Sequence, residues 1–283
     1  MPSRLQIAAF LAAGLAALAA PGEARATTVG QWLLDQGPSG AVIGAVADSS
    51  GNGFTGTGTP RAGADTYSST VPAGFGGTSA LFSGNSMIDM AGTGTSALGF
   101  TGSFTIEAWI RETASVGSNY ALIAGKWGWT GSNNAGYGLF ISPSDKILFG
   151  ISTNGTDLIG PQAAAAIATN TWYHVAGVFD HAANTLTLYV TQQGQATSTF
   201  STSYTGTVFN NAIDFTIGGY PTQPPQGQSV AGYIDEVRVS NVALAQAALG
   251  LNGSIAPPVP EPATLGLALA GLGVAVRGAR RRR

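Results

Sequence analysis

A glycine-rich stretch from Gly125 to Gly138 holds the densest mixture of aromatic and amide side chains in the sequence. These side chains are Trp127, Trp129, Asn133, Asn134 and Tyr137. Aromatic rings stack on the faces of pyranose sugars, and a few polar groups then bind the sugar hydroxyls. A second loop-like stretch adds Tyr220. We therefore expect these six residues to bind carbohydrate. The alternative is that the two tryptophans pack over an open end of the fold.

Oxygen ligands for a hard cation are concentrated in a second segment, Asp48–Gly53. The Asp48 carboxylate, the Asn52 side chain and the carbonyls next to glycines are ligand types that Ca²⁺ prefers. The simpler reading is that Asp48 only accepts hydrogen bonds in a tight turn. The sequence therefore predicts a candidate calcium loop here.

Groups suited to catalysis are sparse. The chain has no cysteine, and its two histidines, His174 and His181, lie in no nucleophile or zinc motif. A glycosidase needs two carboxylates that project into one cleft. Glu107 has no second acid on its strand face, and Asp235 and Glu236 are adjacent and so point to opposite sides. The sequence thus predicts a protein that is not an enzyme.

Short segments of alternating apolar and polar residues must position these groups. Residues 103–111 alternate in this way, as a half-buried strand does. Similar segments flank the turns at 143–145 and 181–184, which predicts two hairpins. Only Ala243–Leu251 resembles a helix, and it is short. Many strands without alternating helices predict an all-β fold, an antiparallel sandwich of two sheets.

The charge of the chain limits its partners. Between Thr27 and Pro258, five basic residues stand against twelve acidic ones, a formal charge of −7, whereas the whole chain carries −2. Nucleic acid binding requires clustered lysine and arginine, so no nucleic acid partner is expected. Without disulfides, an exported domain has to rely on its hydrophobic core and on any bound metal ion.

Both ends of the chain carry transport signals. Residues 1–26 combine an early arginine, an apolar run and the small residues Ala24 and Ala26, which is the pattern of a secretory signal peptide. At the other end, Pro260-Glu261-Pro262 precedes an apolar run over residues 263–276 and a terminal arginine cluster. This run is shorter than the ~20 residues of an ordinary membrane span. We expect a signal helix and a C-terminal hydrophobic helix to flank the sandwich.

In order, composition and position, the C-terminal elements resemble the PEP-CTERM sorting signal of Gram-negative bacteria. The resemblance implies that Pro260, Glu261 and Pro262 form a motif read by a membrane exosortase. It further implies transient anchoring in the inner membrane, followed by delivery to the cell surface or extracellular matrix.

From Val29 to Leu251, the segments "ALFSGNSMIDM", "FTIEAWIR", "TWYHVAGVFD" and "GYIDEVRVSNVAL" follow one another in a family-specific order. They resemble laminin-G-like, concanavalin A-like domains. The resemblance implies a jelly roll whose first and last strands pair. It would bring Asp235 toward Asp48 and Asn52 as a further ligand of a structural Ca²⁺. The family often has "YVDG" where this chain has "YVTQQG" over 189–194, so the following turn lacks the family's carboxylate.

The sequence therefore predicts four parts: a signal peptide (1–26), a laminin-G-like jelly-roll domain (27–255), a proline-rich spacer with the sorting motif (256–262) and a hydrophobic, arginine-ended tail (263–283). The expected function is binding to polysaccharide or another glycan at the cell surface or in the matrix, as in adhesion or biofilm association. The alternatives are a structural matrix protein without a ligand and a glycoside hydrolase.

Overall fold

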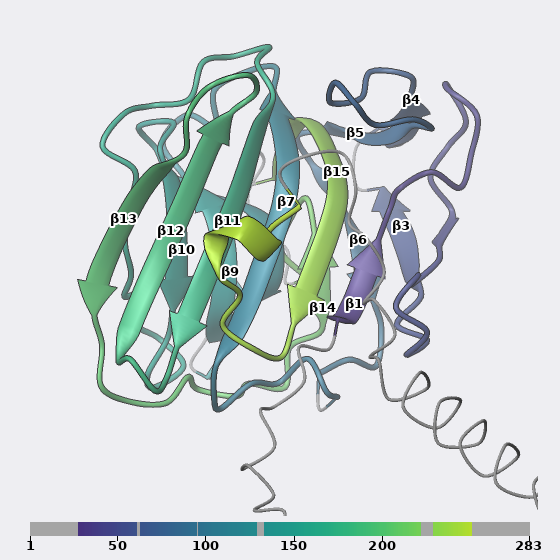
Figure 1. Cartoon of the computed structure of the whole chain (residues 1–283). Helices are drawn as coiled ribbons and strands as arrows, with labels where there is room; N and C mark the ends of the chain where they lie inside the picture. The colour runs from purple at the N-terminus through teal and green to yellow at the C-terminus, as the bar shows by residue number, and fades with distance from the viewer. Residues whose placement is uncertain (1–27, 61–62, 95, 129–132, 222–228, 251–283) are drawn as a thin grey trace, which may run out of the picture.

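The computed structural model describes residues 28–60, 63–94, 96–128, 133–221 and 229–250. These ranges form fifteen strands and one 3-10 turn (Figure 1). The elements are β1 (Thr28–Trp32), β2 (Ala45–Val46), β3 (Gly56–Pro60), β4 (Thr66–Ser68), β5 (Ser79–Ser83), β6 (Ser86–Met90), β7 (Phe104–Glu112), β8 (Ala121–Trp127), β9 (Ala135–Ile141), β10 (Ile147–Ile151), β11 (Tyr173–Asp180), β12 (Thr185–Gln192), β13 (Ser198–Ser203), β14 (Phe215–Ile217), β15 (Ala231–Ser240) and η1 (Gln246–Ala248). The two predicted flanking helices lie outside the described residues.

The strands form two sheets that lie face to face, and the predicted all-β antiparallel sandwich is confirmed. The large sheet has eight strands in the order β13-β12-β11-β7-β15-β5-β4, with β1 also paired to β15. The small sheet has seven, in the order β10-β9-β8-β14-β6-β3-β2. In Figure 1 the large sheet stands in front of β9 and β10. The pairing of β1 with β15 joins the first and last strands, as expected for a jelly roll.

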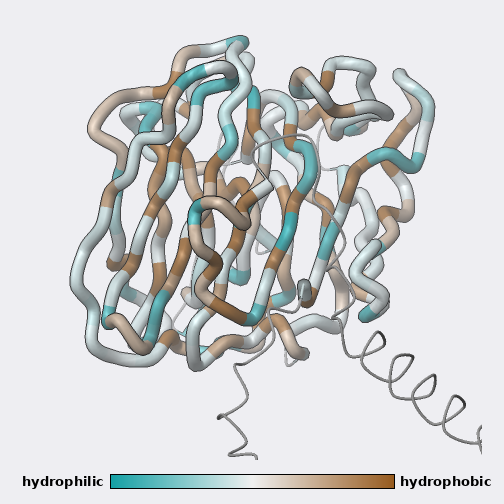
Figure 2. The backbone as a smooth tube through the Cα atoms, in the orientation of Figure 1, coloured by the Kyte–Doolittle hydropathy of each residue, from teal (hydrophilic) through white to brown (hydrophobic). Residues whose placement is uncertain are grey.

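Alternating side chains build the core between the sheets. In β7, Phe104, Ile106, Ala108 and Ile110 are all fully buried in the main hydrophobic cluster. The same alternation appears in Figure 2 as brown and pale segments that follow one another along the strands. Because successive strand residues point to opposite faces, this pattern fixes which side of each strand meets the core.

One strand carries a glycine where it faces the opposite sheet. Gly177 in β11 lies over the ring of Phe149 in β10, and a Cβ atom at this position would collide with that ring. The sandwich core therefore interlocks an aromatic ring with a strand that has no side chain there, which is a common reason for glycine inside a strand.

Both predicted hairpins are present, between β9 and β10 and between β11 and β12. Each turn contains a residue with a left-handed backbone, Asp145 (φ 54°) and Asn184 (φ 55°). Asp and Asn adopt this conformation more readily than other non-glycine residues. The turn chemistry read from the sequence therefore matches the observed turns.

The helix predicted at Ala243–Leu251 is wrong for the residues that the structure describes. Only Gln246–Ala248 form a single 3-10 turn, η1, which lies across the outer face of the large sheet (Figure 1). Side chains of the sheet compete for its backbone groups, because Arg238 donates to the Ala248 carbonyl (2.9 Å) and Trp109 donates to the Gly250 carbonyl (3.1 Å). These tertiary hydrogen bonds replace the helical pattern.

Candidate functional site

The predicted aromatic surface is mostly interior. The ring of Tyr137 is 2% exposed and packs among Phe100, Phe104 and Phe215, and its hydroxyl donates to the Leu98 carbonyl (2.8 Å). Tyr137 shares its strand face with core residues of β9, so the alternation of that strand already pointed inward. As a stacking platform for a sugar, Tyr137 is therefore corrected to a core residue.

Trp127 and Tyr220 belong to a smaller apolar cluster on the outer side of the small sheet. The Trp127 ring is 9% exposed and meets Phe140 edge-on, with 5.1 Å between ring centroids. Tyr220 is 1% exposed, and its hydroxyl donates to the Tyr120 carbonyl (3.1 Å). Both side chains are thus packed within this cluster, and sugar binding by them stays a prediction. Trp129 lies outside the described residues.

The asparagines of the same loop have mainly a backbone role. Asn133 is exposed and adopts a left-handed conformation (φ 65°). The carbonyl of Asn134 accepts a hydrogen bond from the Asn211 side chain (2.7 Å), which also donates to the Lys126 carbonyl (3.1 Å). Asn211 therefore fixes the ends of this loop, and its position far along the chain gave no sequence signal for that contact.

The candidate calcium loop is closed by its own hydrogen bonds. Asp48 accepts from the backbone N–H groups of Gln31 (3.0 Å), Ser50 (2.9 Å) and Phe54 (3.0 Å). The Asn52 side chain donates to the Val29 carbonyl (2.9 Å). In this state both predicted ligands organise the turn beside β1. Calcium binding by them stays a prediction.

Asp235 lies among other acids. It is 1% exposed, and burial, then the charges of Glu236 and Asp35, raises the pKa of Asp235 to about 9. A bulge between Asp235 and Arg238 breaks the regular pairing of β15, and Glu236 has a left-handed backbone (φ 51°). Within the described ranges, no three acidic or histidine side chains are grouped to hold a metal.

Glu107 and His174 form a buried polar network on the outer face of the large sheet. Both side chains are 1% exposed, and His174 Nε2 lies 2.9 Å from Glu107 Oε2. Arg238 pairs with the other oxygen of Glu107, and the N–H of Gly250 donates to Oε2 (2.8 Å). Burial alone would raise the pKa of Glu107, but these partners lower it below its usual value. The network holds η1 in place, which supports a structural role for His174.

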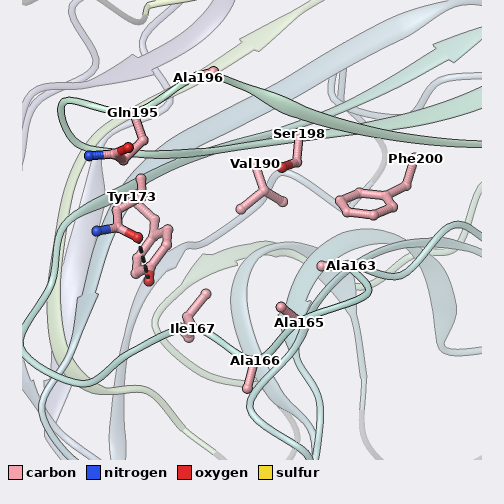
Figure 3. Close-up of a pocket in the computed structure, with 11 residues that line it drawn as sticks. Ala163, Ala165, Ala166, Ile167, Tyr173, Val190, Gln195, Ala196, Ser198 and Phe200 are labelled. Atoms are coloured by element: carbon pink, nitrogen blue, oxygen red, sulfur yellow. Dashed lines mark hydrogen bonds between the residues drawn. The ribbon is translucent and has the colours of Figure 1, made fainter.

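A hollow lies elsewhere, at the edge of the sandwich beside β12 and β13. We call it the edge hollow; its volume is about 330 Å³. The residues that line it are Ala163, Ala165, Ala166, Ile167, Tyr173, Val190, Gln192, Gln195, Ala196, Ser198 and Phe200. Figure 3 shows Val190, Ser198 and Phe200 facing Ala163 and Ile167 across the opening. β13 is an edge strand of the large sheet, and it forms one wall of the hollow together with β12.

The walls of the edge hollow combine rings, methyl groups and amides. The Tyr173 hydroxyl accepts from the Ala168 N–H (3.0 Å) and lies 3.5 Å from Gln192 Oε1 (Figure 3), which anchors the ring. Phe200 is half-buried, and the side chains of Gln195 and Ser198 are exposed. None of the described lining residues is charged. Such a surface stacks on a flat apolar face and bonds to hydroxyl groups.

Sequence reasoning missed this site because its walls come from three separate segments. The available signal was the glutamine-rich turn "TQQGQ", which departs from the resembling family by lacking a carboxylate. Gln192 and Gln195 of this turn reach the hollow, whereas none of the described residues of the aromatic loop (125–128 and 133–138) lines it.

The fold defines the chain as a two-sheet jelly-roll β-sandwich. A family model described as the Concanavalin A-like lectin/glucanases superfamily, Laminin_G_3, matches residues 82–249. This match spans more than half of the chain, and the chain belongs to that superfamily. No curated protein matches the chain.

Solved structures with a similar fold include carbohydrate-bound proteins. The binding domain of botulinum neurotoxin DC in complex with SialylT aligns with a TM-score of 0.52 and 14% identity, over 77% of this chain and 49% of that one. This chain therefore spans about half the length of that domain. The CBM40 of Ruminococcus gnavus IT-sialidase, bound to alpha2,3 sialyllactose, aligns with a TM-score of 0.49 and 16% identity, over 62% of this chain and 96% of that one. At such identities the likeness is one of fold alone.

The C-terminal tail matches a second model. Residues 258–283 fit the PEP-CTERM protein-sorting motif, which includes Pro260, Glu261 and Pro262. The motif indicates that the protein is exported and is sorted by an exosortase to the cell surface or extracellular space. Among the residues that the structure describes, no helix is long and apolar enough to cross a membrane.

Proposed function

We propose that the exported protein binds a glycan in the edge hollow and thereby attaches to polysaccharide at the cell surface or in the matrix. The observation that carries this proposal is the composition of the hollow. The half-buried ring of Phe200 lies beside the amides of Gln192 and Gln195 in a space of about 330 Å³, and the buried ring of Tyr173, 7% exposed, forms part of the wall. This volume is within the ~300–1,000 Å³ of ordinary ligand pockets.

The role we propose is binding and not hydrolysis. Hydrolysis of a glycosidic bond generally requires a pair of carboxylates beside the scissile bond. The described residues that line the edge hollow include no carboxylate. Glu107 of β7 is hydrogen-bonded to His174 and paired with Arg238 on the outer face of the large sheet.

A glycan array with the fragment 27–258 tests the proposal. This fragment contains all fifteen described strands and the core between them. We expect selective retention of a glycan, and Phe200→Ala is expected to weaken binding by up to about tenfold, because an aromatic contact contributes ~0.5–1.5 kcal/mol. The matched control is Thr199→Ala, which alters the neighbouring, outward-facing residue of β13 outside the hollow.

Two results would contradict the proposal in different ways. If the fragment binds no glycan on the array, although its cooperative unfolding shows that it is folded, the result would favour a structural matrix protein without a ligand. Binding that Phe200→Ala and Thr199→Ala leave equally unchanged would place the glycan outside the edge hollow.

A further inference from the structure

A second hollow lies on the opposite side of the same hairpin. We call it the outer hollow; its volume is about 580 Å³. Its described lining residues are Ala73, Trp109, Thr191, Gln193, Gly194, Gln195, Ala196 and Thr197. Gln195 and Ala196 line both hollows. The turn between β12 and β13 is therefore the only described chain segment common to the two spaces.

Strand alternation explains why one hairpin serves two spaces. Val190 and Gln192 of β12 point to the inner side and line the edge hollow, whereas Thr191 between them points outward and lines the outer hollow. The turn itself is tight: Gly194 has φ 78°, and the Gln195 N–H donates to the Gln192 carbonyl (2.9 Å). The hairpin end is thus a narrow ridge with a hollow on either side.

Neither hollow contains a charged residue among those described. The four described lysines and arginines are placed elsewhere. Lys126 donates to the Gly94 carbonyl (2.6 Å), Arg238 pairs with Glu107, and Arg111 lies over the Tyr233 ring at 5.4 Å. Lys146 ends the turn between β9 and β10. Among the residues that the structure describes, a ligand in either hollow therefore meets amides, hydroxyls and rings but no cation.

This distribution of charge selects among sugars. Moving a carboxylate out of water without a cationic partner costs several kcal/mol, whereas hydroxyl groups are satisfied by amides. The formal charge of −7 on residues 27–258 also repels polyanions at a distance. Both effects disfavour uronic acid and sialic acid polymers and leave neutral sugars unaffected.

We propose that the two hollows form one site for a neutral polysaccharide whose chain passes over the β12–β13 turn, with Gln195 in contact on both sides. This inference rests on the proposed glycan-binding function and specifies its ligand class. An extended chain gains from both hollows at once, whereas a short sugar fills only one.

Affinity electrophoresis of the 27–258 fragment tests the ligand class. The gels contain either a neutral polysaccharide (dextran, laminarin or galactomannan) or an anionic one (alginate or polysialic acid). We expect retardation by at least one neutral polymer and none by the anionic polymers, at low and at moderate salt. Stronger retardation by an anionic polymer would overturn the neutral class while leaving glycan binding intact. Retardation by no polymer would contradict the proposed function as well.

Three glutamine variants test the shared ridge. Gln192→Ala alters only the edge hollow, Gln193→Ala only the outer hollow, and Gln195→Ala both. For the retained polymer, we expect each of the first two variants to weaken binding several-fold and Gln195→Ala to weaken it by about tenfold or more. For a disaccharide of the same sugar, Gln193→Ala should have no effect. Polymer binding that Gln193→Ala leaves unchanged would overturn the two-sided site, with Thr199→Ala as the control for folding.

Discussion

Glu112, the last residue of β7, provides a test of how the sandwich treats a buried acid. It lies on the same strand face as the core residue Ile110 and is 1% exposed. Neither carboxyl oxygen has a hydrogen-bond partner of ordinary geometry. Burial, then the charge of Asp145, raises the pKa of Glu112 to about 7, and the Val116 N–H acts weakly in the opposite direction. The folded protein therefore keeps this carboxyl neutral where the unfolded chain ionises it.

The sign and size of the stability effect follow from this difference. Between the unfolded pKa of 4.5 and the folded pKa of about 7, the folded state binds the proton that the unfolded state has released. The free energy of unfolding therefore falls as pH rises through this window and levels off above it. A shift of roughly 2.5 pKa units corresponds to about 3 kcal/mol at ~1.4 kcal/mol per unit.

Urea denaturation of the 27–258 fragment at pH 4.5 and pH 8 measures the effect. From pH 4.5 to pH 8, we expect the free energy of unfolding of Glu112→Gln to fall by about 3 kcal/mol less than that of the unmodified fragment, because glutamine does not ionise. The control is Asp157→Asn. Burial would raise the pKa of Asp157, but hydrogen bonds from Ser152 and Thr153 lower it, so its titration lies below this window. Parallel pH dependences for Glu112→Gln and the unmodified fragment would refute the reasoning.

Three further predictions concern the candidate sites and the tail. Trp127→Ala should lower the free energy of unfolding by about 3 kcal/mol, as for other buried aromatic residues, and leave the glycan affinity of the folded protein unchanged. Urea denaturation and affinity gels measure the two effects. Weaker glycan binding with unchanged stability would instead indicate that the aromatic loop is the binding site. If calcium binds at Asp48, a hundredfold excess over Kd should add ~2.7 kcal/mol to the free energy of unfolding and so raise the Tm relative to a chelator. Asp48→Asn should abolish this rise, and identical melting curves with calcium and with chelator would exclude the site. Replacing Pro260-Glu261-Pro262 by three alanines should block processing and leave full-length protein in the membrane fraction. Deleting residues 263–283 should instead release soluble protein. Normal localisation of the triple-alanine protein on immunoblots would contradict recognition of the motif.

The fold was predictable because alternation and turn chemistry are local. The apolar residues that alternate from Phe104 to Ile110 all lie in the core cluster, although the residues between them are buried as well. The hairpin turns contain Asp145 and Asn184, which are residue types favoured at left-handed positions. The predicted helix failed where local propensity met tertiary competition. The backbone groups of Ala248 and Gly250 bond to Arg238, Trp109 and Glu107, which no window around residues 243–251 contains.

The candidate site was less predictable because side-chain composition does not reveal direction. Tyr137 is typical of a sugar platform by residue type, but it lies one pleat from Leu139 in β9 and points into the core with it. The edge hollow depends on how β12 and β13 lie against the segment 163–167 and Tyr173. The segments that line the hollow are far apart in the sequence and meet only once the sheets have assembled. No single segment therefore carries a sequence pattern that predicts the hollow.

The outer face of the large sheet fixes the end of the sandwich through described residues that all precede the matched sorting motif. The strand β15 is followed by residues 241–250, which Thr105 fastens at Val242 and Leu244 through its hydroxyl (2.8 and 2.9 Å). Gly250, the last described residue, is held from both sides, since its N–H donates to Glu107 and its carbonyl accepts from Trp109. Because these contacts all precede the matched motif at 258–283, cleavage within the tail removes none of them. Trp109 also lines the outer hollow, so the residue that fastens the end of the domain is part of the surface proposed to hold the polysaccharide.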